Sequence, residues 1–272
     1  MSENTASGSV GVAVAQFAPG DDEARNLEAI ADLVAQAAGR GAHVVVLPEY
    51  SNWFRDPFDA QLREHAQPLD GAFVIALTML AAEHGVTIVA GLVEEAEDAQ
   101  RVRNTVVAVD ASGVHAVYRK LHLYDAFGQR ESDWIEPGAI EAPRTFTVAG
   151  LTFGIMTCYD LRFPEVTRRI VDAGADVVLV PSEWVRGPLK EHHWSTLLHA
   201  RAIENTVFVA AADHTPPVGV GHAVIIDPQG VTRAELGTRT DVAVAFLDPA
   251  EVAEVRRVNP VLQLRRFGVT AL

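Results

Sequence analysis

The chain has 272 residues, of which 49% are hydrophobic and 21% charged, a composition typical of a globular protein that needs neither a metal nor a disulfide to form a core. Lys and Arg number 22 against 36 Asp and Glu, so the formal net charge is −14 at pH 7. So acidic a surface repels phosphate backbones and anionic lipids, and we expect neither nucleic acid nor a membrane as partner. The single cysteine, Cys158, excludes an internal disulfide and every Cys-based zinc ribbon. With no basic leader and no membrane-length apolar run, we expect a cytoplasmic enzyme.

Strand-like and helix-like apolar patterns alternate along most of the chain. In chain order they predict a strand 9–17, a helix 23–38, a strand 43–48, a helix 72–84, a strand 86–93, a hairpin 102–110 with 114–120, a hairpin 145–148 with 152–156, a helix 163–173, a strand 177–180, a helix 191–205, strands 207–212, 223–226 and 242–247, and a helix 249–257. Segments 121–144 and 213–221 read as loops rich in Gly, Pro and charge.

Strand–helix units interleaved with hairpins predict an α/β protein with mixed rather than purely parallel sheets. So many strands exceed what one open sheet holds comfortably, so we expect two packed sheets with helices outside. No linker, repeat or low-complexity stretch divides the chain. We therefore predict a single domain over 1–272, with its core at about 9–258 and a C-terminal tail at 259–272.

Cys158 ends an apolar strand and precedes a helix start, where Pro164 suits the first turn and Glu165 the N-terminal dipole. A cysteine at such a turn lies at the carboxyl edge of a sheet, where the helix N-terminus favours the thiolate. Cys158 is therefore a candidate nucleophile. Spacing alone leaves open that it is a small buried hydrophobic residue.

Two further polar residues end apolar strands in the same way. Glu49 directly follows the run 43–48, and Lys120 closes the run 114–120. Each alone is more typical of a solvated strand end. Together with Cys158, however, they could supply a general base, an oxyanion partner and a nucleophile.

These residues lie in motifs that resemble those of the nitrilase (carbon–nitrogen hydrolase) superfamily, which uses a Glu–Lys–Cys triad. The matching segments are Leu47-Pro48-Glu49, Tyr118-Arg119-Lys120-Leu121-His122-Leu123, Arg130-Glu131-Ser132-Asp133 with Pro137-Gly138, Cys158-Tyr159-Asp160-Leu161-Arg162-Phe163-Pro164-Glu165, Arg201-Ala202-Ile203-Glu204-Asn205 and Asp227-Pro228-Gln229-Gly230. They follow the family's order over about 11–246, nearly the whole chain. The chain is most similar to the Nit-type amidase branch, which includes ω-amidase and deaminated-glutathione amidase.

The resemblance implies a four-layer αββα sandwich, no cofactor, no metal and commonly a homodimer. It further implies a thiol amidase that cleaves a non-peptide C–N bond through a Cys158 thioester and releases ammonia. Glu49 would then be the general base, Lys120 and the backbone N–H of Tyr159 the oxyanion donors, and Glu131 the family's second active-site glutamate. A carbamoyl-amide hydrolase, a nitrilase and a catalytically silent binding subunit remain alternatives.

Substrate identity rests on weaker signals. Arg130 and Arg162 lie in the catalytic motifs, and arginine suits a carboxylate because its planar fork donates two parallel hydrogen bonds. We therefore expect a small carboxylate-bearing amide, although a structural pairing of either arginine with Asp or Glu is an alternative. Two departures from the family pattern leave the substrate open. Ala223 replaces a loop serine, and the segment Pro181-Ser182-Glu183-Trp184 carries the charged Glu183. Glu183 and Trp184 are candidate substrate contacts.

The predicted helix 191–205 carries Trp194, Leu197, Leu198 and Arg201 at helical spacing. In the family, helices beside the active site pair subunits, so this stripe is a candidate dimer contact. Packing into the chain's own core is nearly as good an explanation.

Overall fold

The structure, a computed structural model, describes residues 8–98 and 100–271. Its strands are β1 (Val10–Gln16), β2 (Val44–Val46), β3 (Thr87–Glu95), β4 (Val102–Asp110), β5 (Gly113–Arg119), β6 (Thr145–Val148), β7 (Leu151–Ile155), β8 (Val177–Pro181), β9 (Phe208–Ala212), β10 (Val224–Ile226), β11 (Thr232–Glu235) and β12 (Asp241–Leu247). Its helices are α1 (Glu23–Gly39), α2 (Gln61–Glu64), α3 (Ala72–His84), α4 (Pro164–Asp172), α5 (Lys190–Asn205) and α6 (Pro249–Val258), with 3₁₀ turns η1 (Glu131–Asp133) and η2 (Cys158–Arg162).

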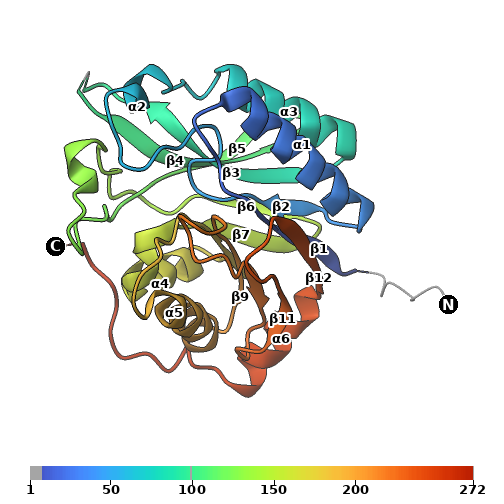
Figure 1. Cartoon of the computed structure of the whole chain (residues 1–272). Coiled ribbons are helices and arrows are strands. Elements are labelled where there is room, and N and C mark those ends of the chain that lie inside the picture. The colour runs from blue at the N-terminus through green and yellow to red at the C-terminus, as the bar shows by residue number, and fades with distance from the viewer. Residues whose placement is uncertain (1–7, 99, 272) are drawn as a thin grey trace.

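The strands form two six-stranded sheets, in the orders β12-β1-β2-β3-β4-β5 and β11-β10-β9-β8-β7-β6. Each sheet combines parallel pairs, such as β1 with β2 and β7 with β8, and antiparallel hairpins, such as β4 with β5 and β6 with β7. In Figure 1 the sheets lie face to face, with α1 and α3 covering one and α4 and α5 covering the other. The predicted α/β fold, a four-layer αββα sandwich of two mixed sheets, is confirmed.

Alternation along the strands explains the layers. In β1, Val12 and Val14 point into the core between the sheets, while Ala13 and Ala15 pack under α1 and α3. Such a strand is buried on both faces, which is why its sequence reads as a continuous apolar run. A third cluster joins the second sheet to α4 and α5.

Helix boundaries follow local signals. The Asp22 side chain accepts hydrogen bonds from the backbone N–H groups of Ala24 and Arg25 at the start of α1, a standard N-cap. Gly85 ends α3 in the left-handed conformation, at φ 66°, where glycine carries no steric penalty. No helix in the described part of the chain is both long and apolar enough to cross a membrane.

Two elements were absent from the sequence-based assignment. The edge strand β11 is mostly exposed, so it lacks the apolar alternation that marks a half-buried strand. The one-turn helix α2 buries only Leu62, too little for a helical pattern. In α5, Trp194 and Leu198 of the candidate dimer stripe are 1% and 0% exposed within the chain itself and belong to its core. Packing into the chain's own core therefore explains these two residues, and a dimer stays a prediction.

Candidate active site

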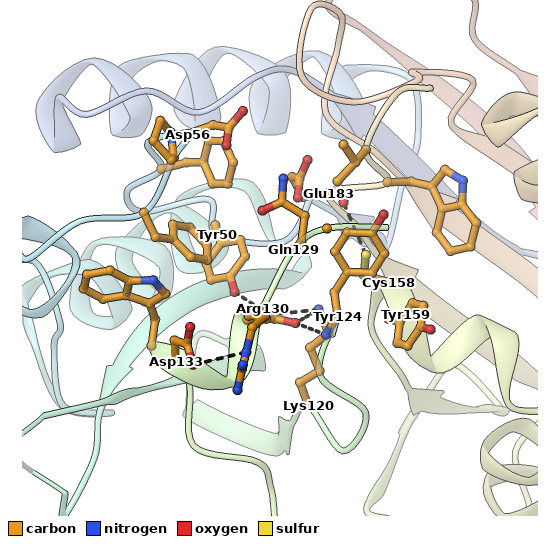
Figure 2. A pocket seen from close by; sticks show the side chains of 18 of the residues that line it. Tyr50, Asp56, Lys120, Tyr124, Gln129, Arg130, Asp133, Cys158, Tyr159 and Glu183 are labelled. Carbon is orange, nitrogen blue, oxygen red and sulfur yellow. Dashed lines mark hydrogen bonds and ion pairs between the residues drawn. The ribbon is translucent and has the colours of Figure 1, made fainter. Parts of the chain in front are cut away.

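Of the predicted catalytic residues, Lys120, Glu131 and Cys158 line one cavity of about 330 Å³ (Figure 2). Glu49 is fully buried beside this cavity, where it accepts hydrogen bonds from Lys120 and from the backbone N–H of Glu183. Glu49 follows β2 and Lys120 follows β5 of the first sheet, whereas Cys158 follows β7 of the second. Glu131 enters from η1, in the long segment between β5 and β6. Residues more than one hundred positions apart are thus brought together because the strands that precede them, in two sheets packed face to face, end on the same side of the molecule.

Lys120 lies between two buried carboxylates. Its Nζ is 2.9 Å from Glu49 Oε1 and 2.9 Å from Glu131 Oε2. The side chains of Lys120, Glu49 and Glu131 are only 2%, 1% and 6% exposed. An ammonium has three N–H donors, so two bonds to the carboxylates leave one for a group in the cavity.

Two buried polar residues fix the carboxylates further. Asn104 Nδ2 donates to Glu49 Oε1 at 2.6 Å and lies 3.1 Å from Glu131 Oε1. The Tyr50 hydroxyl donates to Glu131 Oε1 at 2.7 Å, and the backbone N–H of Tyr124 donates to Glu131 Oε2 at 2.6 Å. Glu131 is therefore held as an acceptor from several directions, as a permanently ionised carboxylate requires.

The turn that carries Glu49 depends on a close backbone approach. A Cβ added at Gly91 of β3 would lie 2.6 Å from Glu49 Cα, so only glycine lets the chain after β2 cross β3 at this point. The second oxygen of Glu49, Oε2, accepts a bond of 2.6 Å from the backbone N–H of Glu183.

Cys158 adopts a left-handed conformation, with φ 46°, which is uncommon for a residue with a side chain and typical of functional turns. The turn is held by a capping box between Thr157 and Asp160. Asp160 is fully buried and also accepts from the Tyr118 hydroxyl at 2.6 Å and from the His122 backbone N–H at 3.0 Å. Since Tyr118 and His122 flank Lys120, Asp160 ties the lysine's strand end to the cysteine's turn.

Electrostatics separate the two glutamates. Burial raises the pKa of Glu49 above its usual value, and the nearby Glu131 adds to this effect. For Glu131, burial is outweighed by Lys120 and by its backbone and side-chain hydrogen bonds, so its pKa is lowered. Burial would lower the pKa of Lys120, but both carboxylates raise it well above the usual value. One carboxyl is thus poised to exchange a proton while its partner stays charged.

The predicted low pKa of the Cys158 thiol is wrong. Burial, and next the charge of Glu49, raise its pKa well above the usual value. The 3₁₀ turn η2 spans only five residues, and its dipole does not offset burial. The thiol is therefore protonated at rest, and its Sγ lies 3.3 Å from the Glu183 carbonyl oxygen, to which it donates.

The candidate substrate residues differ in their surroundings, although all of them line the cavity. Arg130 is 73% exposed at its side chain and lies 3.5 Å from Asp133, the structural pairing considered above. Arg162 stacks on Trp184, with 4.9 Å from guanidinium carbon to ring centroid. The ring of Tyr159 lies beside Tyr124. Ala223 is fully buried directly before β10 and is not among the residues that line this cavity.

Sequence reasoning missed several lining or supporting residues. Asn104 carried a usable signal, because it is a polar residue within the predicted strand 102–110, shortly before the apolar run that begins at Val106. Tyr50 and Tyr124 sit in loops whose conformation no periodicity predicts. Lys190 begins α5 one residue before the predicted start and is 7% exposed. Within residues 8–98 and 100–271, no cluster of His, Cys, Asp and Glu is arranged to hold a metal ion.

Comparison with known proteins gives consistent matches. The carbon-nitrogen hydrolase family matches residues 11–257. The chain is 41% identical over 258 residues to the deaminated glutathione amidase of Escherichia coli O157:H7, covering 94% of this chain and 97% of that protein. The crystal structure of the Caenorhabditis elegans NitFhit protein superposes with a TM-score of 0.86 at 30% identity, over 96% of this chain and 66% of that one.

A variant of the amidase from Nesterenkonia sp., with the acetamide moiety of fluoroacetamide added covalently at its active-site cysteine, superposes with a TM-score of 0.78 at 27% identity, covering 97% of this chain and all of that one. Family match, identity and superposed fold agree over nearly the whole length. The chain belongs to the carbon-nitrogen hydrolase family, the nitrilase superfamily, and is an enzyme of its amidase type.

Proposed function

We propose that the protein hydrolyses small amides through a thioester on Cys158, with Glu49 as general base and acid. The observation that carries this proposal is the buried Glu49–Lys120–Glu131 grouping, with contacts of 2.9 Å on both sides of the ammonium, of which Lys120 and Glu131 line the same cavity as Cys158. Its three parts, a proton acceptor, a fixed cation and a nucleophile, are what acyl transfer needs.

In acylation, the protonated thiol of Cys158 gives its proton to the Glu49 carboxylate as sulfur attacks the amide carbonyl carbon. Because the pKa of the thiol is raised and that of Glu49 is raised toward it, the transfer accompanies attack rather than preceding it. The carbonyl oxygen becomes an oxyanion that accepts bonds from the free N–H of Lys120 Nζ and from the backbone N–H of Tyr159. When the C–N bond breaks, Glu49 returns the proton to the departing nitrogen.

Deacylation repeats these steps with water. Water attacks the thioester carbonyl carbon while Glu49 takes one of its protons. The same donors stabilise the second oxyanion, the C–S bond breaks, and the sulfur recovers the proton from Glu49. Glu131 stays ionised throughout and holds Lys120, because its pKa is lowered in this environment. The products are a carboxylic acid and ammonia or, from a substituted amide, an amine.

The comparisons support the proposal in two ways. The Nesterenkonia amidase variant carries an acetamide moiety on its active-site cysteine, and Cys158 lies in a cavity of the same fold. The relative from Escherichia coli O157:H7 is named as an amidase of deaminated glutathione, which favours an amide over a nitrile as substrate here.

The test is product release from a panel of ω-amides, carbamoyl compounds and nitriles, with Cys158→Ala as the inactive control. We expect ω-amides to be turned over fastest and the variant to show none of this activity. Turnover of nitriles or carbamoyl compounds alone would assign the same residues to that chemistry. No turnover of any of them by the wild-type protein would favour a silent binding subunit and contradict the proposal.

A further inference from the structure

Asp213 is a fully buried carboxyl that the proposed mechanism does not use. Its Oδ1 accepts a bond of 2.6 Å from the backbone N–H of Trp184, and its Oδ2 accepts bonds of 2.9 and 3.0 Å from those of Val220 and Gly221. A Cβ added at Gly219 would lie 2.9 Å from the same Oδ2, so the loop after β9 closes tightly around this side chain. Both oxygens are thus paired with backbone donors, as burial requires.

The Trp184 N–H belongs to the same planar peptide group as the Glu183 carbonyl. This peptide is trans, so its N–H and C=O bonds point in opposite directions. Asp213 holds the N–H on one side, and on the other side the carbonyl oxygen accepts from Cys158 Sγ at 3.3 Å (Figure 2). Rotation of this peptide would turn the N–H toward the sulfur and remove the acceptor of the thiol. Asp213 therefore fixes the group that orients the nucleophile.

The bond from Trp184 to Asp213 has no substitute. Among the described residues, this N–H bonds to Asp213 alone, whereas the N–H groups of Val220 and Gly221 also bond to backbone carbonyl oxygens. An unpaired buried N–H is costly, so loss of the carboxyl would release the peptide. Burial raises the pKa of Asp213 well above its usual value, and the backbone N–H donors oppose this effect. The carboxyl accepts the Trp184 bond in either charge state.

The residue after Asp213 holds the proton acceptor. His214 Nε2 lies 2.7 Å from the backbone carbonyl oxygen of Glu49, and burial lowers the pKa of this histidine to about 4. The ring is therefore neutral near pH 7, and because it faces a carbonyl oxygen it carries its hydrogen on Nε2. Glu49 Oε2 in turn accepts from the Glu183 backbone N–H at 2.6 Å. Adjacent residues thus hold the backbone that contacts the thiol and the backbone of its proton acceptor.

We propose that Asp213 is a positioning residue for amide hydrolysis. By fixing the peptide group between Glu183 and Trp184, it sets the direction in which the Cys158 thiol points before its proton moves. This inference rests on the proposed function, in which the thiol is still protonated when the substrate binds. A displacement of reacting groups by about 1 Å can cost about a hundredfold in rate, so a released peptide should lower kcat rather than raise KM.

Asp213→Ala removes the acceptor and is the direct test. For hydrolysis of glutaramide we expect kcat to fall about ten- to a hundredfold while KM stays within about threefold. The apparent pKa of Cys158 is measured from the pH dependence of its alkylation by iodoacetamide. It should fall by at least about 0.5, because the bond to Glu183 that stabilises the protonated thiol is lost. A merely structural role would not move this pKa.

Asp213→Asn is the conservative variant. Its Oδ1 can still accept from the Trp184 N–H, since the N–H groups facing the other oxygen have second acceptors. Its NH₂ group then faces those N–H groups, so the variant should unfold at lower urea concentration than the wild type. We nevertheless expect kcat within about threefold of the wild type and an unchanged pKa of Cys158. A loss of kcat as large as in Asp213→Ala would overturn the proposal.

Asp227→Ala is the matched control. Asp227 is 4% exposed and accepts from the backbone N–H groups of Gln229 and Val231, each at 2.9 Å, but does not line the cavity. This variant should lower the free energy of unfolding and leave both kcat and the pKa of Cys158 unchanged. The proposal is wrong if folded Asp213→Ala keeps both quantities, or if Asp227→Ala changes them equally.

The alkylation measurement needs no substrate, which separates this proposal from the mechanism. An inactive Cys158→Ala together with an unaffected Asp213→Ala would refute the positioning role alone. An active Cys158→Ala would refute the mechanism and with it a role of Asp213 in hydrolysis, even where the thiol pKa shifts as expected. If Asp213→Ala does not fold, hydrogen exchange of the wild type tests the contact: the Trp184 amide should be protected, and exchange at the rate of a free amide would overturn the proposal.

Discussion

Replacing Lys120 with methionine keeps most of the side-chain volume and removes the cation between Glu49 and Glu131. Both ionic contacts measure 2.9 Å and all three side chains are at most 6% exposed. Removing one partner of a buried ion pair costs about 3–5 kcal/mol, because the other charge stays buried and unpaired. Since the pKa of Glu49 is already raised, most of this cost falls on Glu131, and we expect the free energy of unfolding to drop by about 3–5 kcal/mol at pH 7.5.

The sign of the pH dependence follows from the same contacts. In the wild type, Lys120 helps to lower the pKa of Glu131. Without it, we expect burial to outweigh the remaining hydrogen bonds of Glu131 and to raise that pKa above the unfolded value, so that the folded variant binds more protons than its unfolded state. Its free energy of unfolding should therefore rise as the pH falls from 7.5 toward 5.5, and its deficit relative to the wild type should shrink.

Urea unfolding of wild type and Lys120→Met at these two pH values measures the effect. Lys120→Met with Glu131→Gln is the control, because the double variant removes the uncompensated charge and should recover much of the lost stability. Activity should not recover, since loss of an oxyanion donor costs about 10²–10³ in kcat. A loss of stability below about 1 kcal/mol that is independent of pH would refute the idea that Lys120 compensates buried carboxylates.

Three further predictions address the other catalytic groups. Cys158→Ala should fold normally and lose turnover. Residual activity within about tenfold of wild type, a change of only ~1.4 kcal/mol in the activation barrier, would exclude Cys158 as nucleophile. Cys158→Ser should be nearly as inactive, because Glu49 is a weak base for an alcohol. Glu131→Gln should lower kcat more than it raises KM, whereas an effect on KM alone would make Glu131 a substrate-binding residue. Because the pKa of Glu49 is raised, kcat/KM should fall with decreasing pH through an apparent pKa above 4.5. Because the pKa of Cys158 is raised well above its usual value, kcat/KM should show no rise from thiolate formation near neutral pH. A fall of kcat/KM with an apparent pKa at or below 4.5 would contradict the assignment of Glu49 as general base.

The layers of the fold were predictable because nearly every strand is either a continuous apolar run or half of a hairpin. β1 is buried at every position and could be read as a strand from its β-branched residues alone. The same signal explains the failure at β11, where Thr232–Glu235 are mostly exposed and polar. For α5, periodicity located the apolar face but not what covers it, and the structure shows the chain's own core.

Strand ends singled out Glu49, Lys120 and Cys158 as candidates, but the motifs that resemble the nitrilase superfamily were needed to predict that they act together, because Cys158 follows a strand of the other sheet. What surrounds them was not predictable. The raised pKa of Cys158 depends on burial. The hydrogen bond from Tyr50 to Glu131 joins residues 81 positions apart, and that from Asn104 to Glu49 joins residues 55 positions apart. Lys190 joins the cavity only through the fold of the segment before α5, for which the sequence has no repeating pattern.

The most direct test of the central claim is the intact mass of the enzyme during turnover of glutaramide, quenched in acid within the first turnovers. We predict an adduct with the mass of the acyl group, located by digestion on the peptide that contains Cys158, lost on further incubation and absent from Cys158→Ala. Two results would contradict catalysis through a Cys158 thioester. One is hydrolysis by the wild type at the full rate with no adduct detected, either in the wild type or in a Glu49→Gln variant in which deacylation should be slowed. The other is an adduct on any other residue.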